Sequence, residues 1–300
     1  MIPSSTIIPV VLFAYARPEH LARVLSCLRE NAIPLIYAFA DGAKGSVDSV
    51  LVDETRAVLR GIDWCEVRLV ERPQNLGLGR NVIAGVTEVA ALHDMFVVWE
   101  DDLICVPGTY DWMCGALRHY ADNLQVMSVT AWNHPRLIPS GSGGEAYFDG
   151  RGECWVWGAY ARSWVGMMEE NAIEKMAAAQ TRGVAPTAYG YDLPEMARIE
   201  QEKNIWAVRW VYHHLQHDGL SLRPPWSMVE HIGFDAMATN AGVDEGWANK
   251  GLRLACAIPS PWPPPKLNPE CAVLWRKALP PRWRRRANSL LRRLLRRIRP

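Results

Sequence analysis

Two kinds of segment alternate along the first hundred residues. Short, continuous apolar runs alternate with segments whose apolar residues recur at helical spacing. Continuous apolar runs are typical of strands that are buried on both faces of a parallel sheet. The predicted strands are residues 7–13, 35–40, 66–70 and 95–99, and the predicted helices are residues 18–28, 46–59 and 79–92. This alternation predicts an α/β fold with a mostly parallel sheet flanked by helices.

The pattern becomes less regular after residue 107. Helices are predicted over residues 109–122, 173–182 and 205–216, and strands over residues 126–130, 154–160 and 227–232. Residues 259–265 read PSPWPPP, a composition typical of an extended connector. We therefore expect one α/β domain over residues 1–258, a proline-rich connector over 259–281 and a separate segment over 282–300.

The last of these segments differs from the rest of the chain in charge. Residues 276–300 hold 11 of the 33 Lys and Arg residues and none of the 32 Asp and Glu residues. On a helix over residues 282–299, one face would be apolar and the other nearly all Arg. The apolar positions are Trp283, Ala287, Leu290, Leu291, Leu294, Leu295 and Ile298. Such a basic amphipathic helix is typical of binding to an anionic membrane surface.

The charge of this helix alone does not decide what it binds. It could be a solvated helix or a helix that docks on an acidic protein. The leucine stripe argues against nucleic acid, because phosphate binding needs no apolar face. The chain shows no secretory signal, and its seven cysteines are odd in number and lack metal-type spacing. We expect a cytoplasmic protein, peripheral on the inner face of the cytoplasmic membrane, with no nucleic-acid partner.

Three carboxylates, Glu100, Asp101 and Asp102, directly follow the predicted strand 95–99. Burying them without a partner would cost several kcal/mol. Ligands of open α/β sheets bind at the carboxyl ends of strands. Carboxylates at this place therefore predict a divalent cation, Mn²⁺ or Mg²⁺, held together with substrate phosphates. A solvated acidic turn is the alternative from this segment alone.

Three further polar segments are expected at the same edge of the sheet. A glycine pair and an arginine at a helix N-terminus favour phosphate, and an aspartate can accept from a base or ribose. Each segment alone is also common in ordinary turns, but their order and placement together favour a nucleotide site. The residues concerned are Ala14, Tyr15, Arg17, Asp41, Gly77 and Arg80.

Together these segments resemble glycosyltransferases of the GT-A fold (family 2-like), the nucleotide-diphospho-sugar transferase architecture. VVLFAYARPEHLARVL is similar to the first βα unit of that fold, NLGLGRN to its Asn-x-Gly-x-x-x-Asn segment, and EDD to its DxD motif. WEDDLICVPGTYDWM, WVWGAYARSW and GLSLRPPWSMVEHIGFDAMATN resemble the N-acetylglucosaminyltransferase I group and its bacterial relatives. The resemblance covers about residues 7–240.

The resemblance implies transfer of a hexosyl or N-acetylhexosaminyl group from a nucleotide-diphospho-sugar, with a UDP-sugar favoured. The implied acceptor is a glycan or lipid-linked saccharide of bacterial surface polysaccharide or lipopolysaccharide assembly, and the implied outcome is inversion. Asp102 would bind the metal directly, while Glu100 and Asp101 would contact ribose, sugar or metal-bound water. His231 would be a further metal ligand or an ordinary strand-end histidine.

The resemblance also assigns the residues around the nucleotide. Ala14, Tyr15 and Arg17 would line the base and phosphate, Asp41 would meet the base, and Arg80 would lie near the diphosphate or sugar.

The chain departs from the group at the expected general base. Relatives carry a Trp-Asp-x-x-Trp-like segment, whereas this chain reads WAVRW with Ala207 in place of the acid. Inverting transfer needs a carboxylate to take the acceptor proton. Asp192 is our first substitute, with Glu153 and then Glu202 behind it, although Asp192 could instead be a helix N-cap. A base supplied by the acceptor is also open.

Two other functions remain open from the sequence. A catalytically degenerate, sugar-nucleotide-binding scaffold of a membrane glycan-assembly complex would explain Ala207. A sugar nucleotidyltransferase would share the fold, but the usual Gly-rich loop ending in Lys is missing after the first strand.

Overall fold

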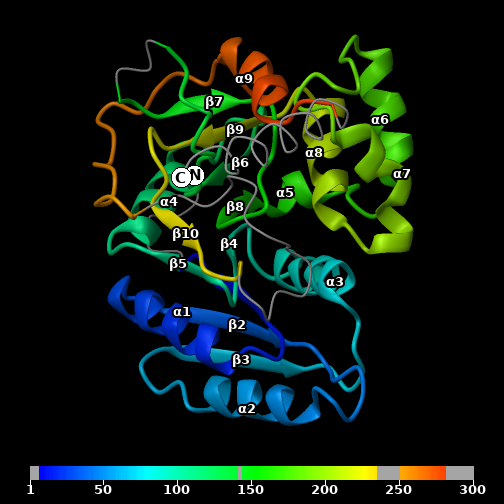
Figure 1. The fold of residues 1–300 in the computed structure, drawn as a ribbon. Coiled ribbons are helices and arrows are strands. Elements are labelled where there is room, and N and C mark those ends of the chain that lie inside the picture. The colour runs from blue at the N-terminus through cyan, green and yellow to red at the C-terminus, as the bar shows by residue number, and fades with distance from the viewer. Residues whose placement is uncertain (1–6, 141–143, 235–250, 282–300) are drawn as a thin grey trace, which may run out of the picture.

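The computed structural model describes residues 7–140, 144–234 and 251–281. Its N-terminal half is a parallel sheet in the order β3-β2-β1-β4. The strands are β1 (Val10–Ala14), β2 (Leu35–Ala40), β3 (Glu66–Glu71) and β4 (Met95–Glu100), and the helices between them are α1 (Pro18–Glu30), α2 (Ser49–Arg60) and α3 (Leu78–Ala90) (Figure 1).

The same sheet continues into the second half of the chain. The added strands are β8 (Trp157–Tyr160), β6 (Val126–Thr130), β9 (Leu220–Arg223) and β7 (Tyr147–Asp149), in that spatial order after β4. β8 runs antiparallel to both β4 and β6, and β7 is antiparallel to β9. The prediction of an α/β fold with a mostly parallel sheet flanked by helices is confirmed.

A separate two-stranded sheet pairs β5 (Leu103–Cys105) with β10 (Val229–His231). Since β5 begins just after the three carboxylates, this pairing places the end of β10 beside them. The remaining helices are α4 (Thr109–His119), α5 (Ala161–Trp164), α6 (Ala172–Thr181), α7 (Leu193–Lys203), α8 (Trp206–Gln216) and α9 (Glu270–Ala278). Helices α6, α7 and α8 gather on one side of the sheet (Figure 1).

Apolar side chains fill a core on each face of the sheet. On one face α1 buries the apolar stripe Leu21, Val24 and Leu28. On the other face α3 packs on the stacked rings of Phe13 and Phe39, whose centroids lie 5.5 Å apart. Six of the twelve largest fully buried side chains are tryptophans, so the high tryptophan content is mainly core filling.

The segment that we expect to be a connector packs against the domain. Helix α9 lies within it, and the side chains of Cys271 and Trp275 are fully buried. Trp262 meets Trp112 edge to face, and the Pro263 carbonyl accepts the Tyr120 hydroxyl. Residues 259–281 therefore include a helix and core contacts that their proline content does not reveal. The domain boundaries themselves stay a prediction.

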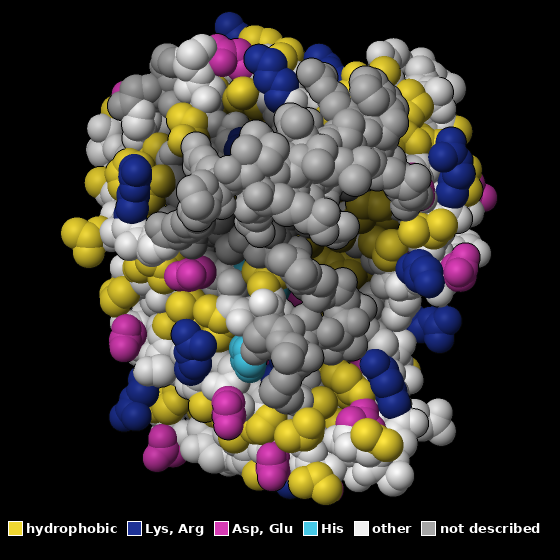
Figure 2. Space-filling view, viewed as in Figure 1, with side chains coloured by type: hydrophobic (Ala, Val, Ile, Leu, Met, Phe, Trp, Pro, Cys, Tyr) yellow, Lys and Arg dark blue, Asp and Glu magenta, His cyan; other side chains and the backbone are white. Residues whose placement is uncertain are grey.

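The basic segment at residues 282–300 lies outside the described residues. Among the helices that the structure describes, none has both the length and the apolar character needed to cross a membrane. On the described part of the face in Figure 2, acidic and basic side chains are interspersed. The basic segment thus differs in charge from the described part of the chain.

Candidate active site at the carboxyl edge of the sheet

The acidic cluster at the end of β4 is held by the loop that follows β1. The Arg17 guanidinium forms an ion pair with Asp102, with Nη1 2.7 Å from Oδ2. The backbone N–H of Tyr15 donates to Oδ2 of Asp101 at 2.7 Å. Asp101 and Asp102 are both buried. One arginine and one backbone donor thus offset part of the desolvation of these carboxylates.

The cluster still carries more negative charge than its described partners neutralise. Burial, and next the charge of Asp102, raise the pKa of Asp101 to about 7. The same causes raise the pKa of Glu100 well above its ordinary value. A buried group of like charges is stabilised by an added cation or by protons. The electrostatics of this turn therefore suit a cationic ligand.

Asp102 and His231, which we expect to bind metal, lie next to one another. Pairing of β10 with β5 brings Nε2 of His231 to 3.4 Å from Oδ2 of Asp102. The N–H of Gly233 donates to Nδ1 of His231, so a neutral imidazole in this arrangement carries its proton on Nε2. In this geometry, Nε2 of His231 carries a proton that faces Asp102. That arrangement is favoured over one in which Nε2 binds a metal.

The described residues fit a metal ion that is held mainly by Asp102 and by the phosphates of a bound substrate. Oδ1 of Asp102 is buried and has no hydrogen-bond partner within the described part of the chain. No group of three or more His, Cys, Asp or Glu side chains among the described residues is arranged to hold a metal. Mg²⁺ and related ions bind readily through one or two carboxylates plus substrate phosphates and water. The site could therefore hold such an ion once phosphate is present.

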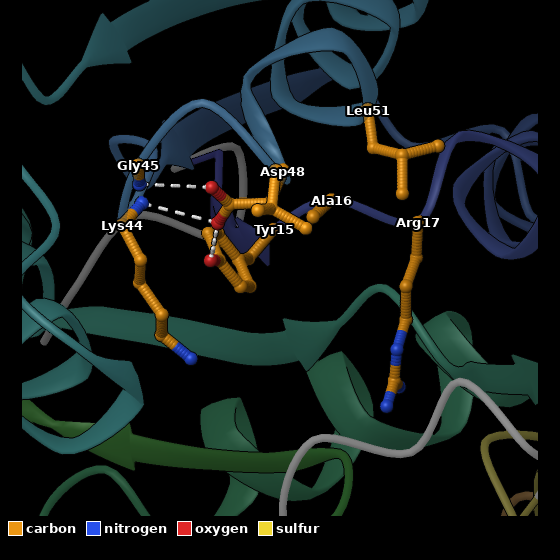
Figure 3. Close-up of a pocket in the computed structure, with 8 residues that line it drawn as sticks. Tyr15, Ala16, Arg17, Lys44, Gly45, Asp48 and Leu51 are labelled. Carbon is orange, nitrogen blue, oxygen red and sulfur yellow. Dashed lines mark hydrogen bonds between the residues drawn. The ribbon is translucent and has the colours of Figure 1, made fainter.

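A pocket of about 470 Å³ opens between the loops that follow β1 and β2. Figure 3 shows its wall: the Tyr15 hydroxyl and the backbone N–H groups of Lys44 and Gly45 all donate to the Asp48 carboxylate. The Lys44 ammonium lies 5.1 Å from the centre of the Tyr15 ring. Arg17 also lines the pocket, which connects it to the acidic cluster.

Asp48 is a pocket residue that the sequence analysis does not single out. It makes no side-chain cap bond and instead fixes the Tyr15 ring. The hydrogen bond from Tyr15, and next that from Lys44, lower the pKa of Asp48 to about 2. Its place in the segment between β2 and α2, on the carboxyl side of a buried strand, is the sequence signal that could have found it.

The Asp41 carboxylate accepts hydrogen bonds from the protein itself, and its expected contact with the base stays a prediction. Its Oδ1 accepts the N–H groups of Gly42 and Leu76, and its Oδ2 accepts those of Gly77 and the Asn75 amide, at 2.8–3.2 Å. Four donors saturate the four lone-pair sites of a carboxylate. The geometry favours a role in which Asp41 ties the end of β2 to the loop before α3.

The glycines of NLGLGRN also have a packing reason. A Cβ at Gly79 would lie 2.3 Å from the backbone oxygen of Asn204, and Gly77 has φ +75°. The loop between α7 and α8 therefore covers this end of α3, and the expected approach of phosphate to Gly77 stays a prediction. Arg80, in the first turn of α3, is exposed. Its predicted contact with diphosphate or sugar stays a prediction.

Glu153 lies at the same edge as the acidic cluster. β8 is antiparallel to β4 and begins at Trp157, which pairs with Val98, so the bend at residues 154–156 lies at the carboxyl end of β4. Trp155 packs on the His231 ring, with centroids 4.6 Å apart. Burial raises the pKa of the Glu153 carboxyl, and the positive charge of Arg223 opposes that rise.

Asp192 and Glu202 lie on α7. Asp192 is at the N-terminus of this helix but makes no side-chain cap bond, and its Oδ1 is buried without a partner among the described residues. A Cβ at Gly190 would touch both Asp192 and Arg151, so these two side chains lie close together. Glu202 is largely exposed and lies 3.8 Å from Lys203. The structure thus gives Glu202 no contact with the acidic cluster within the described residues.

Comparisons with known proteins add little to this geometry. No family model and no curated protein matches the sequence. Among solved structures, a mannosyltransferase from Pyrobaculum calidifontis in complex with GDP-Man and Mn²⁺ is similar at 11% identity and a TM-score of 0.39, covering 70% of this chain and 75% of that one.

Two further structures are similar over about half of this chain. A UDP-glucose pyrophosphorylase complexed with UDP-glucose has 12% identity and a TM-score of 0.33, covering 55% of this chain and 80% of that chain. HddC from Yersinia pseudotuberculosis has 11% identity and a TM-score of 0.32, covering 52% and 78%. Likenesses this weak carry no argument about activity, which must come from the residues themselves.

Proposed function

We propose that this protein is a glycosyltransferase of the GT-A type that uses Mn²⁺ or Mg²⁺. It transfers a sugar from a nucleotide-diphospho-sugar, with a UDP-sugar favoured, to a glycan or lipid-linked saccharide, with inversion. The observation that carries the proposal is the meeting of Arg17, the buried Asp102 and the pocket beside Tyr15 at one edge of the sheet. Arg17 supplies a positive charge for the diphosphate, Asp102 a carboxylate for the metal ion, and Tyr15 an aromatic wall for the nucleoside.

The pocket would take the nucleoside of the donor. Its volume of about 470 Å³ lies within the range of small-molecule sites. The Tyr15 ring offers a stacking face, held in place by its bond to Asp48. Arg17 would place positive charge next to the diphosphate, since it bridges the pocket and Asp102. A bound divalent ion would supply Lewis-acid stabilisation of the leaving diphosphate.

The protein would need one more group, a base for the acceptor hydroxyl. In the transfer, the acceptor oxygen forms a bond to the anomeric carbon, the bond to the diphosphate breaks with its electron pair leaving on the diphosphate, and the acceptor proton goes to a carboxylate. Glu153 lies two residues before Trp155, whose ring packs on His231 beside Asp102, and this favours Glu153 over Asp192 for the role.

The basic segment would bring the enzyme to its acceptor. An Arg near an anionic surface contributes about 1 kcal/mol to binding. Residues 282–299 would therefore hold the protein on the inner face of the cytoplasmic membrane, where lipid-linked saccharides of surface polysaccharide or lipopolysaccharide assembly are found. This part of the proposal rests on the sequence pattern alone.

A second function is favoured by one observation. Ala207, in the first turn of α8, offers no carboxylate where relatives are expected to carry the base. A degenerate protein that binds sugar nucleotides without transferring them would have this feature. The buried carboxylate of Glu153 at the same edge argues for the enzyme.

Thermal unfolding of the full-length protein with UDP, GDP, CMP or dTDP, with and without Mn²⁺, tests the nucleotide site. We expect one nucleotide to raise Tm only with Mn²⁺, and Asp102→Ala to abolish the rise. Asp63→Ala is the matched control, because Asp63 is an exposed aspartate before β3, at the opposite edge of the sheet. No response to any nucleotide, or equal responses in both variants, would refute the proposal.

A further inference from the structure

A fully buried arginine on β9, beside the last strand of the sheet order, lies between two carboxylates. Nε of Arg223, on β9, is 2.6 Å from Oδ2 of Asp149 on β7. Nη2 of the same guanidinium is 3.4 Å from Oε1 of Glu153 and 3.1 Å from the carbonyl oxygen of Arg151. A buried ion pair is costly unless its geometry and hydrogen bonds are good. Arg223 thus orients Glu153 through one oxygen of its carboxylate.

Trp275 closes this cluster from helix α9. Its indole Nε1–H donates to Oδ2 of Asp149 at 2.8 Å, the oxygen that also accepts from Arg223. The guanidinium carbons of Arg151 and Arg223 lie 4.1 Å and 5.2 Å from the centre of the Trp275 ring. An aromatic face next to a guanidinium is attractive, the more so when both are shielded from water.

We propose that Trp275, Asp149 and Arg223 form a positioning relay for the Glu153 carboxylate. Trp275 and Asp149 hold the guanidinium, and the guanidinium holds Oε1, which leaves Oε2 to take the acceptor proton. The three are positioning residues, since the relay acts only through Glu153. The inference rests on the proposed function, because it assumes that Glu153 is the base.

The relay also sets how readily Glu153 gives up its proton. The charged groups that face it are Arg223 on β9, Arg151 in its own loop and Asp149 on β7. Burial raises the pKa of Glu153, whereas the two arginines lower it and Asp149 raises it slightly. Without the Trp275 hydrogen bond, Asp149 and Arg223 gain freedom to move, and Arg223 then meets Glu153 less closely. The pKa of Glu153 should therefore rise.

Trp275→Phe tests the relay, because it removes the indole N–H and keeps most of the apolar volume. Trp112→Phe is the matched control. Trp112 is equally buried, but its Nε1 has no hydrogen-bond partner within the described residues. The Glu153 titration is followed by carboxyl ¹³C NMR of the full-length protein labelled at glutamate, and Glu153→Gln identifies the signal.

We expect the titration midpoint of Glu153 to rise by about one pH unit in Trp275→Phe relative to Trp112→Phe. The acid limb of nucleoside diphosphate release from the donor should shift by the same amount. If Trp275→Phe does not fold, Arg223→Lys, which keeps the charge and loses the forked contacts, should shift the midpoint in the same direction.

The two proposals fail separately. Equal midpoints in the variant and its control, with Mn²⁺-dependent nucleotide binding intact, would overturn the relay alone. If the wild-type protein binds no nucleotide in the presence of Mn²⁺, the proposed function is refuted instead.

Discussion

Replacing Asp41 with Asn distinguishes a loop-holding aspartate from a nucleotide ligand. The carboxylate accepts four hydrogen bonds, three of them from backbone N–H groups. An Asn side chain keeps one acceptor oxygen. In place of the second carboxylate oxygen it has an NH₂ group, which faces the two donors that this oxygen accepts in the wild-type protein. Two of the four bonds are then lost, and the remaining two lose their charge.

The size of the effect follows from these bonds. A hydrogen bond to a charged group contributes about 1.5–3 kcal/mol, so losing two would cost about 3–6 kcal/mol. The loop is only half-buried at Asn75 and Leu76, and water there offsets part of the loss. We expect a destabilisation of about 3 kcal/mol, equivalent to a fall in Tm of about 5 °C for a chain of this length.

Urea unfolding of Asp41→Asn, compared with Asp63→Asn at an exposed turn, measures this cost. Nucleotide binding in Mn²⁺ is measured on the same samples, at a temperature at which both variants are folded. Equal stability of the two variants, together with a more than tenfold loss of nucleotide affinity in Asp41→Asn, would refute the loop-holding role. It would restore the direct contact that the sequence resemblance implies.

Three further predictions concern packing, pH and the membrane. Gly79→Ala should destabilise the protein by more than the ordinary helix preference for Ala would stabilise it, because its Cβ would lie 2.3 Å from the Asn204 oxygen, and thermal unfolding would detect the loss. Burial lowers the pKa of His214 from its ordinary value of 6.5 to about 4; the hydrogen bond with the Trp210 carbonyl opposes this fall, and the charges of His217 and Arg223 add to it. The folded state therefore binds fewer protons than the unfolded state between these two pH values. Lowering the pH from 7 to 5 should reduce the free energy of unfolding by about 2 kcal/mol more in the wild-type protein than in His214→Gln. Replacing Arg292, Arg293, Arg296 and Arg297 with Gln should weaken binding to anionic vesicles about 10³-fold, as measured by co-sedimentation, and leave binding to neutral vesicles unchanged.

The N-terminal half of the fold could be predicted because its strands are buried on both faces. The continuous apolar runs of β1, β2 and β4 reflect that burial directly. Strands β7 and β9 were missed for the opposite reason. They are short, and their burial depends on the pairing of Asp149 with Arg223, two charged residues far apart in the sequence. Helix α9 was hidden by the prolines that precede it.

The candidate site was predicted in part. Residues that follow parallel strands, such as Arg17 and Asp102, meet because the sheet brings those strand ends together. The roles of Asp41 and Gly79 depend on which loops cover them, and no local pattern contains that information. The same holds for Glu153, whose segment is linked to the acidic cluster by the packing of Trp155 on His231.

The measurement that tests the central claim most directly is identification of the nucleotide that the full-length protein releases. Nucleotide-diphospho-sugars are incubated with the protein and Mn²⁺, and the products are separated by ion exchange and identified by mass spectrometry. A parallel reaction contains nucleoside triphosphate and sugar 1-phosphate. We predict Mn²⁺-dependent release of a nucleoside diphosphate that Asp102→Ala lacks and Asp63→Ala keeps. Pyrophosphate from the parallel reaction, or binding of the donor with no release, would contradict a glycosyltransferase.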